Sequence, residues 1–304
     1  MRPDLSKRAG HPVQPWLAAL CVALCTLAAP ALASAQSDRV YPSEMDVVYR
    51  TAPVGSGTTA LQLDIYQPQS ACTAPRPFIV MIHGGGFRQG SKTDAAWVEI
   101  AEAISAAGYV AITVDYRLEG EKPVPSPEFA AMRQGYLDAN PVQPPRVQDV
   151  SLINTVVSAT EDVRDAALWV QANAADRCID PDRFAIWGSS AGAVSGQLIS
   201  YALDDFGITG PRPQLFVDYW GRAGFPGMMA AGDPAIFILH GTADTVIPFS
   251  LAEALRDEAQ AARLVYAFHP NQGAGHGFAS NRIFQSDPSP FQRTLDFLNR
   301  NLPL

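Results

Sequence analysis

Short, uninterrupted runs of apolar residues alternate with segments of helical spacing along most of this chain, and that alternation limits the folds open to it. A strand that is apolar at every position is buried on both faces, as in a parallel sheet covered by helices. The runs that predict such strands are residues 78–83, 109–115, 184–188, 215–220 and 235–240. The predicted helices are residues 95–107, 161–174, 191–202, 251–262 and 290–301. This order predicts an α/β fold, with a mostly parallel central sheet and helices on both faces.

Three further strands are expected near the two ends of the fold, at residues 45–50, 61–67 and 264–268. In the second of these, Leu61, Leu63 and Ile65 alternate with other residues, which predicts a half-exposed antiparallel strand. The helix at 161–174 is expected to follow Thr160 as its N-cap, because acidic residues occupy the first turn after it.

One connection is too long and too rich in proline for an ordinary loop, and it covers residues 119–159. A connection of this length in a compact domain is usually functional or carries its own structure. We predict that it is an insertion that forms part of a cap, with residues 129–137 as a short amphipathic helix. The alternative is a mobile surface loop.

The first 35 residues predict a secretory signal peptide. Lys7 and Arg8 provide a positive start, residues 16–29 an apolar stretch, and Ala33-Ser34-Ala35 a small-residue cleavage site. The alternative is an uncleaved anchor. We therefore expect a secreted or periplasmic protein, cleaved near Ala35, with a single domain in residues 36–304.

Composition excludes several classes of protein. The chain has 304 residues, of which 47% are hydrophobic and 17% charged, which is typical of a globular protein and not of a disordered one. Its net charge of −8 argues against nucleic acid or an anionic membrane surface as the main partner. No apolar run reaches the roughly 18 residues of a membrane span. We expect a small-molecule or polysaccharide-linked substrate; the oligomeric state is left open.

A possible nucleophile lies in the sequence Gly188-Ser189-Ser190-Ala191-Gly192, which matches G-x-S-x-G. The match alone is weak, but here an apolar strand ends directly before it and a helix begins directly after it. That is the context of a nucleophile elbow, in which a tight strand-to-helix turn exposes the serine hydroxyl. Ser190 is therefore the candidate nucleophile.

A second motif, His83-Gly84-Gly85-Gly86-Phe87, also follows a predicted buried strand. Successive glycines can present backbone N–H groups to a developing oxyanion. The alternative is a flexible glycine loop. We expect His83 itself to stabilise this loop without taking part in the chemistry.

Asp244 and His276 each lie just past a predicted strand, as Ser190 does. The carboxyl ends of parallel strands meet at one edge of the sheet, where ligand sites form. The chain order Ser, Asp, His is the order found in α/β-hydrolases. Two other histidines fit less well, because His269 ends its strand beside a proline and His240 is expected to be a core or turn residue.

Five segments together resemble a known family, the α/β-hydrolase esterases. They are HGGGF (83–87), DYRL (115–118), DPDRFAIWGSSAG (180–192), HGTADTVIP (240–248) and GHGF (275–278). The resemblance covers about residues 45–302 and is closest to hormone-sensitive-lipase-like carboxylesterases and to bacterial acetyl xylan and feruloyl esterases. Ser189 stands where the lipase-like branch commonly has Asp, which favours the acetyl and feruloyl esterase branch.

This resemblance implies the role of each candidate residue. Ser190 would be the nucleophile, His276 the general base and Asp244 the acid that orients it. The oxyanion-hole N–H groups would come from Gly85, Gly86 and Ala191. No metal or cofactor is implied.

The resemblance also bears on three residues outside the chemistry. Asp162 matches a structural acid of the family. The strands that follow Cys72 and Cys178 would be neighbours, which predicts a disulfide between these cysteines; the alternative is two buried free thiols. Phe87 and Trp220 are candidates to wall the substrate pocket, with core packing as the alternative.

The expected function is a secreted serine esterase that cleaves short-chain carboxylic esters through an acyl-enzyme, with acetyl or feruloyl groups on polysaccharide as candidate substrates. The alternatives are a lipase for longer acyl chains and a non-catalytic binding module with a hydrolase fold. The sequence leaves the acyl and alcohol preferences open.

Overall fold

The computed structural model describes residues 43–140, 146–277 and 283–304. The predicted signal peptide, residues 1–35, lies outside these ranges. By their internal contacts, the described residues belong to one compact unit. None of the helices within the described ranges is long and apolar enough to cross a membrane.

Eight strands form one sheet in the order β1-β2-β4-β3-β5-β6-β7-β8. Strands β1 and β2 and strands β2 and β4 pair antiparallel, and every other neighbouring pair is parallel. The predicted mostly parallel sheet is thus confirmed. Its strands are β1 (Glu44–Val54), β2 (Gly57–Tyr66), β3 (Arg76–Ile82), β4 (Val110–Val114), β5 (Ile179–Ser189), β6 (Leu215–Tyr219), β7 (Ala235–Gly241) and β8 (Tyr266–Asn271).

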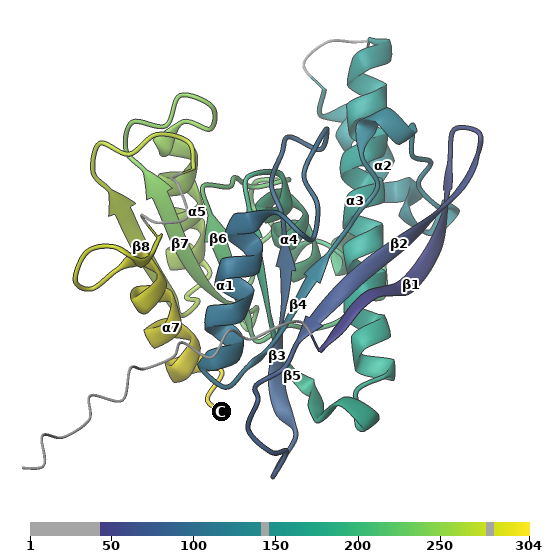
Figure 1. Ribbon diagram of the computed structural model, residues 1–304. Coiled ribbons are helices and arrows are strands. Elements are labelled where there is room, and N and C mark those ends of the chain that lie inside the picture. The colour runs from purple at the N-terminus through teal and green to yellow at the C-terminus, as the bar shows by residue number, and fades with distance from the viewer. Residues whose placement is uncertain (1–42, 141–145, 278–282) are drawn as a thin grey trace, which may run out of the picture. The chain divides into compact units, whose positions relative to one another are not determined.

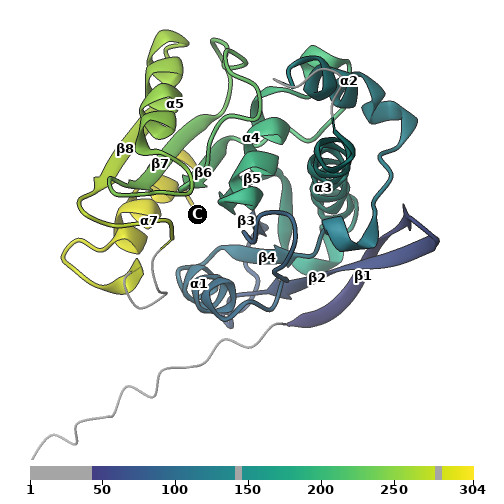
Figure 2. The same ribbon diagram turned by 90° about the horizontal axis from the view of Figure 1, so that it is seen from above.

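Helices cover both faces of the sheet, as Figure 2 shows most clearly. On one face lie α1 (Ala95–Ala106) and α7 (Pro290–Asn301), and on the other lie α3 (Val147–Ala172), α4 (Ala191–Tyr201) and α5 (Phe249–Ala261). A further helix, α2 (Ala130–Asp138), packs beside α3 (Figure 1). The 3₁₀ turns of the described chain are η1 (Glu119–Glu121), η2 (Pro127–Phe129), η3 (Ala175–Arg177) and η4 (Asp204–Phe206).

Strand β3 shows why the apolar runs are uninterrupted. Phe78, Val80 and Ile82 face the core beneath α3 and α4, whereas Ile79 and Met81 face the core beneath α1 and α7. All five side chains are at most 1% exposed. Since both faces of the strand are covered, every position from Phe78 to Ile82 is apolar.

Helix α3 begins at Val147, so the prediction that this helix starts after Thr160 was wrong. The Thr160 hydroxyl donates to the carbonyl of Val156 in the preceding turn, as it does inside a helix. Glu161 and Asp162, which resemble acids of a first helical turn, are buried in the middle of α3. Tertiary ion pairs, and not the helix dipole, explain these acids.

Those ion pairs come from two arginines. Arg117 is fully buried and binds both Glu161 and Asp162. Arg50 on β1 binds the same two carboxylates from the other side. Burial raises the pKa of Asp162 to about 6 although Arg117 favours its ionised form. The expected structural role of Asp162 fits this position, where it fastens α3 to β1 and to the loop after β4.

The segment 119–159 is helical over much of its length. The short helix expected at 129–137 is confirmed as α2, whereas residues 147–159, expected to be irregular, are the first part of α3. Contacts fix α2 and η2 to α3: Arg164 pairs with Glu128 at 2.7 Å and lies over the Phe129 ring. Residues 141–145 lie outside the described ranges.

Two smaller expectations need correction. Strand β2 is half exposed only in its first part, because Asp64 and Tyr66 are about as buried as their apolar neighbours Leu63 and Ile65. The Lys92 ammonium is itself buried and binds the Asp64 carboxylate at 2.8 Å, which explains why a charged residue can be buried at this position of β2. Strand β8 begins two residues later and ends three residues later than expected.

The predicted disulfide is confirmed. Cys72 and Cys178 are bonded, with their Cα atoms 6.0 Å apart. The cysteines precede β3 and β5, which pair in parallel from Arg76 and Ile179 onward. The bond therefore lies at the edge of the sheet where strands begin, opposite the edge that carries Ser190.

Candidate active site

The Ser190 side chain lies at a sharp turn between β5 and α4. Its backbone φ is +51°, a value that L-residues other than Asn and Asp rarely adopt. A Cβ atom on Gly192 would clash with the carbonyls of Ile82 and His83, so only glycine lets α4 start this close to the end of β3. The strained turn is the geometry of a nucleophile elbow.

Three polar groups from distant parts of the chain form a continuous hydrogen-bonded chain. The Ser190 hydroxyl lies 2.9 Å from Nε2 of His276. Nδ1 of His276 lies 2.7 Å from Oδ2 of Asp244. Because an ionised carboxylate only accepts hydrogen bonds, Nδ1 carries the proton and Nε2 is free to accept the serine proton. The structure thus brings together all three residues that the sequence singled out.

The carboxylate of Asp244 is fully buried and well satisfied. Its Oδ1 accepts the backbone N–H groups of Val246 and Ile247 at 2.8 and 2.9 Å. Burial opposes ionisation, but the hydrogen bonds from His276 and from these two amides outweigh it, so the pKa of Asp244 lies below its ordinary value. The acid is therefore negatively charged when His276 needs an acceptor.

A second histidine also faces this carboxylate. Nε2 of His240 lies 3.2 Å from Oδ2 of Asp244 and 2.9 Å from the Ile247 carbonyl, and the side chain is fully buried. The sequence indicated a core or turn residue at this position. The burial fits that expectation, but the contact with Asp244 was missed because the spacing of His240 and Asp244 alone does not show which way a buried imidazole turns.

The glycine loop lies directly against the elbow. A Cβ atom on Gly84 would come within 3.3 Å of Cβ of Ser190. Gly85 and Gly86 both have positive φ, at 106° and 63°. Within the described ranges, the backbone N–H groups of Gly85, Gly86 and Ala191 have no acceptor, so three donors are free close to the serine.

Tyr116 holds this loop in place. Its hydroxyl lies within hydrogen-bond distance of two carbonyls, His83 at 3.0 Å and Gly84 at 3.1 Å, and its ring stacks on the His83 imidazole at 4.2 Å. Burial lowers the pKa of His83, which keeps it neutral in the loop. The expected stabilising role of His83 fits this packing. Tyr116 was recognised only as part of the DYRL segment, without a role.

The two aromatic residues proposed for the substrate pocket are largely buried. Phe87 is 6% exposed and packs edge-on against Tyr116. Trp220 is 8% exposed, packs on Tyr219 and lies next to Gly277, the residue after His276. Both therefore contribute to the core, and a contact with substrate stays a prediction for each.

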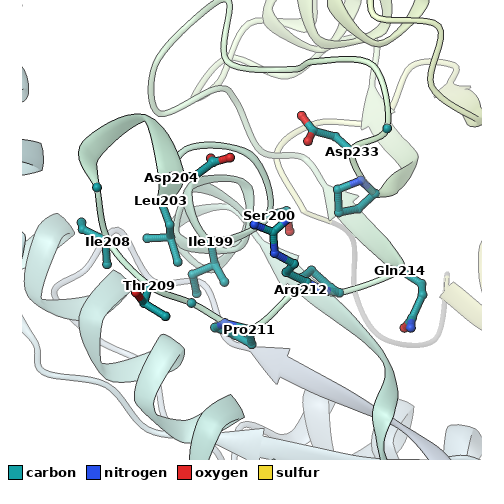
Figure 3. A pocket seen from close by; sticks show the side chains of 15 residues that line it. Ile199, Ser200, Leu203, Asp204, Ile208, Thr209, Pro211, Arg212, Gln214 and Asp233 are labelled. Atoms are coloured by element: carbon teal, nitrogen blue, oxygen red, sulfur yellow. The ribbon is translucent and has the colours of Figure 1, made fainter.

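The large cavity drawn in Figure 3 is not at this site. It has a volume of about 610 Å³ and is lined by the end of α4 and by the loops that precede β6 and β7, including Asp204, Arg212 and Asp233. These segments lie where strands begin, whereas Ser190 follows the end of β5. Among the described residues, no cluster of three or more His, Cys, Asp or Glu side chains is arranged to hold a metal ion.

Comparison with known sequences gives matches that cover different lengths of this chain. The BD-FAE family model matches residues 63–130. The non-reducing polyketide synthase ausA of Aspergillus calidoustus is 26% identical over 224 residues, which are 68% of this chain and 8% of that protein. The probable carboxylesterase 13 of Arabidopsis thaliana is 36% identical over 88 residues, which are 27% of this chain and 25% of that protein. The chain therefore spans a quarter or less of the length of these two curated relatives.

A solved structure matches over nearly the whole fold. Thermogutta terrifontis esterase 2 phosphorylated by paraoxon aligns with a TM-score of 0.65 and 23% identity, over 87% of this chain and 96% of that chain. Together with the strand order, this match shows that the chain has the α/β-hydrolase fold. The family match and the carboxylesterase match confirm the resemblance to the α/β-hydrolase esterases.

Asp218 is a buried acid behind the elbow that the sequence did not indicate. It lies on β6, fully buried, and its Oδ1 accepts the N–H of Gly221 at 2.8 Å. Its Oδ2 has no partner in the part of the chain that the structure describes. Burial raises the pKa of Asp218 to about 7, against the smaller opposing effect of the Gly221 amide.

Asp218→Asn is expected to gain stability relative to the wild type as pH rises. In the folded protein the Asp218 carboxyl group keeps its proton up to about pH 7, whereas in the unfolded chain it loses it at about pH 4. The wild type therefore loses stability as pH rises between these values, and the variant does not because its side-chain amide does not titrate. Between about pH 5 and pH 8 the difference in unfolding free energy should move by roughly 2–3 kcal/mol in favour of the variant. Chemical denaturation of both proteins measures it. A pH-independent difference would contradict a raised pKa at Asp218.

Proposed function

We propose that this chain is a carboxylic ester hydrolase, a serine esterase that works through a Ser190–His276–Asp244 triad and an acyl-enzyme. The observation that carries the proposal is the unbroken chain of hydrogen bonds from the Ser190 hydroxyl through the His276 imidazole to the buried Asp244 carboxylate. A non-catalytic module with this fold would not need the hydroxyl, the imidazole and the carboxylate aligned in this way, and all three are present and aligned.

The reaction follows from the positions of the protons. Oγ of Ser190 attacks the ester carbonyl carbon while Nε2 of His276 takes the hydroxyl proton, and Asp244 stabilises the imidazolium. The C–O bond to the alcohol then breaks, and the leaving oxygen takes the proton from Nε2. Water attacks the acyl-enzyme in the same way, which releases the carboxylic acid and restores the Ser190 hydroxyl.

The negative charge of the tetrahedral intermediate develops on the former carbonyl oxygen of the ester. The free N–H groups of Gly85, Gly86 and Ala191 are the donors proposed to receive it, and Ala191 adds the positive end of the α4 dipole. The loss of one such donor typically costs about 3 kcal/mol in an acyl-transfer enzyme. Tyr116 binds the carbonyls of His83 and Gly84 and so helps to hold the glycine loop in one conformation.

We propose short acyl groups as the substrate class. A lid that binds long acyl chains would present an apolar face. In α2 and the turn before it, however, the large apolar side chains Phe129 and Met132 are fully buried in the protein's own core. Acetyl and feruloyl groups linked to polysaccharide are the candidates within this class.

We also propose that the protein is exported. A disulfide persists in an oxidising compartment, and Cys72–Cys178 is such a bond. Cleavage of the predicted signal peptide would remove Cys21 and Cys25, so the exported chain would retain only the two bonded cysteines.

Ser190→Ala is expected to lose activity by about 10⁴-fold or more, because the nucleophile is absent. Hydrolysis of p-nitrophenyl acetate measures the loss, and the mass of the protein after treatment with paraoxon shows whether a covalent adduct forms. Ser195→Ala is the matched control, since this hydroxyl lies further along α4, is buried and has no hydrogen-bond partner in the described ranges. Full activity, or an adduct, in Ser190→Ala would refute the assignment.

The rate of hydrolysis is expected to be highest for the shortest acyl chains. The measurement is kcat/KM for p-nitrophenyl acetate, butyrate, octanoate and dodecanoate, with release of acetate from acetyl xylan measured in parallel. A maximum at octanoate or dodecanoate would favour the lipase alternative and contradict the short-chain proposal.

Exported protein is expected to begin near Gln36 and to contain no free thiol. N-terminal sequencing and thiol titration of the unreduced, denatured protein measure these two properties. A retained Met1 would contradict cleavage, and two titratable thiols would contradict the oxidising compartment.

A further inference from the structure

The second imidazole beside Asp244 has no part in the reaction described above. His240 is the last residue but one of β7, and its side chain is fully buried. Its Nε2 lies between the Ile247 carbonyl at 2.9 Å and Oδ2 of Asp244 at 3.2 Å. Oδ2 is the same oxygen that His276 uses.

The neighbours of His240 settle where its proton lies. Both oxygens that face Nε2 are acceptors, so Nε2 must carry a hydrogen. Nδ1 is buried without a partner in the described ranges, so a second N–H there would be left unpaired. Burial accordingly lowers the pKa of His240, even though the Ile247 carbonyl and Asp244 favour the charged form. The imidazole is neutral, with its single N–H hydrogen-bonded to the Ile247 carbonyl and Nε2 3.2 Å from the Asp244 carboxylate.

The surroundings of His240 contain few charges. Asp244 and His276 are the ionisable groups that act on it, from the loops after β7 and β8. From α5 its neighbour is the ring of Phe249, with centroids 6.1 Å apart. His240 therefore responds to the triad and to little else.

This contact completes the support of Asp244. Val246 and Ile247 hold Oδ1 through their backbone amides, but without His240 the only donor to Oδ2 from the described ranges would be His276 itself. The base gains and loses a proton at Nε2 during the reaction and is 20% exposed, so it is a poor anchor for the group that must orient it. A fixed neutral donor holds Oδ2 in place whatever the state of His276.

We propose that His240 is a positioning residue of the triad: its Nε2–H fixes Oδ2 of Asp244 and withdraws charge from it, which sets the orientation and the basicity of His276. The inference rests on the proposed esterase function. It predicts an effect on kcat and on the acid side of the pH profile, and little effect on KM, because His240 acts on the base and does not touch the substrate.

The test compares His240→Leu, which removes the donor, with His240→Gln, whose side-chain amide can supply an N–H at a similar distance. His240→Leu should lower kcat by about 10- to 100-fold, the range expected for a displaced catalytic group. The acid side of the pH–rate profile of this variant, its acid limb, should move to higher pH, because an Oδ2 without this donor attracts the imidazolium proton more strongly. His240→Gln should restore most of kcat and the original limb.

His269→Gln is the matched control. This half-buried histidine on β8 packs on the Phe237 ring at 4.8 Å and makes no hydrogen bond or ion pair with Asp244 within the described ranges, so its loss should leave kcat and the pH profile unchanged. If His240→Leu lowers only the melting temperature and leaves kcat and the acid limb as in the wild type, the positioning role is refuted. Activity that disappears in Ser190→Ala but is normal in His240→Leu would refute this inference and leave the esterase proposal standing.

A measurement on the unaltered protein covers the case in which His240→Leu does not fold. The ¹⁵N chemical shifts of His240 should report a protonated Nε2 and a bare Nδ1 throughout the pH range of activity. Titration of His240 within that range, or a proton on Nδ1, would overturn the proposal.

Discussion

The site depends on close approach of backbone to backbone at positions that carry no side chain. Gly192 lets the start of α4 touch the carbonyls at the end of β3, and Gly84 lets the glycine loop lie against Ser190. Gly241, at the end of β7, leaves room for the carbonyls of Ala274 and Gly275, which lead to His276. Any Cβ atom at Gly192 or Gly241 would push apart two segments that must meet, so the glycines of these motifs serve assembly as well as turn formation.

Asp244 is the point on which the polar interactions converge. Two backbone amides bind one carboxylate oxygen, and two imidazoles, from His240 and His276, lie at the other. A buried carboxylate costs free energy unless it is fully hydrogen bonded. The donors that meet this requirement also fix the direction in which His276 faces Ser190, so the stability of the loop and the geometry of the base have the same cause.

Much of the fold could be predicted because burial on both faces of a strand leaves a direct pattern in the sequence. The meeting of Ser190, Asp244 and His276 could be predicted because each lies just past a predicted strand. The start of α3 could not, since Thr160 and the acids after it resemble a helix N-terminus until Arg117 is seen to pair with them. The contacts of His240 and Tyr116 were missed for a related reason. Their roles depend on which way a buried polar group turns, and spacing along the chain does not encode that direction.

A high-resolution crystal structure of the wild-type protein after reaction with paraoxon would test the central claim most directly. The account predicts phosphorus bonded to Oγ of Ser190, with the phosphoryl oxygen within hydrogen-bond distance of the N–H groups of Gly85, Gly86 and Ala191 and with His276 still bound to Asp244. Phosphorus on another side chain, or a phosphoryl oxygen turned to solvent while those amides bind elsewhere, would contradict it.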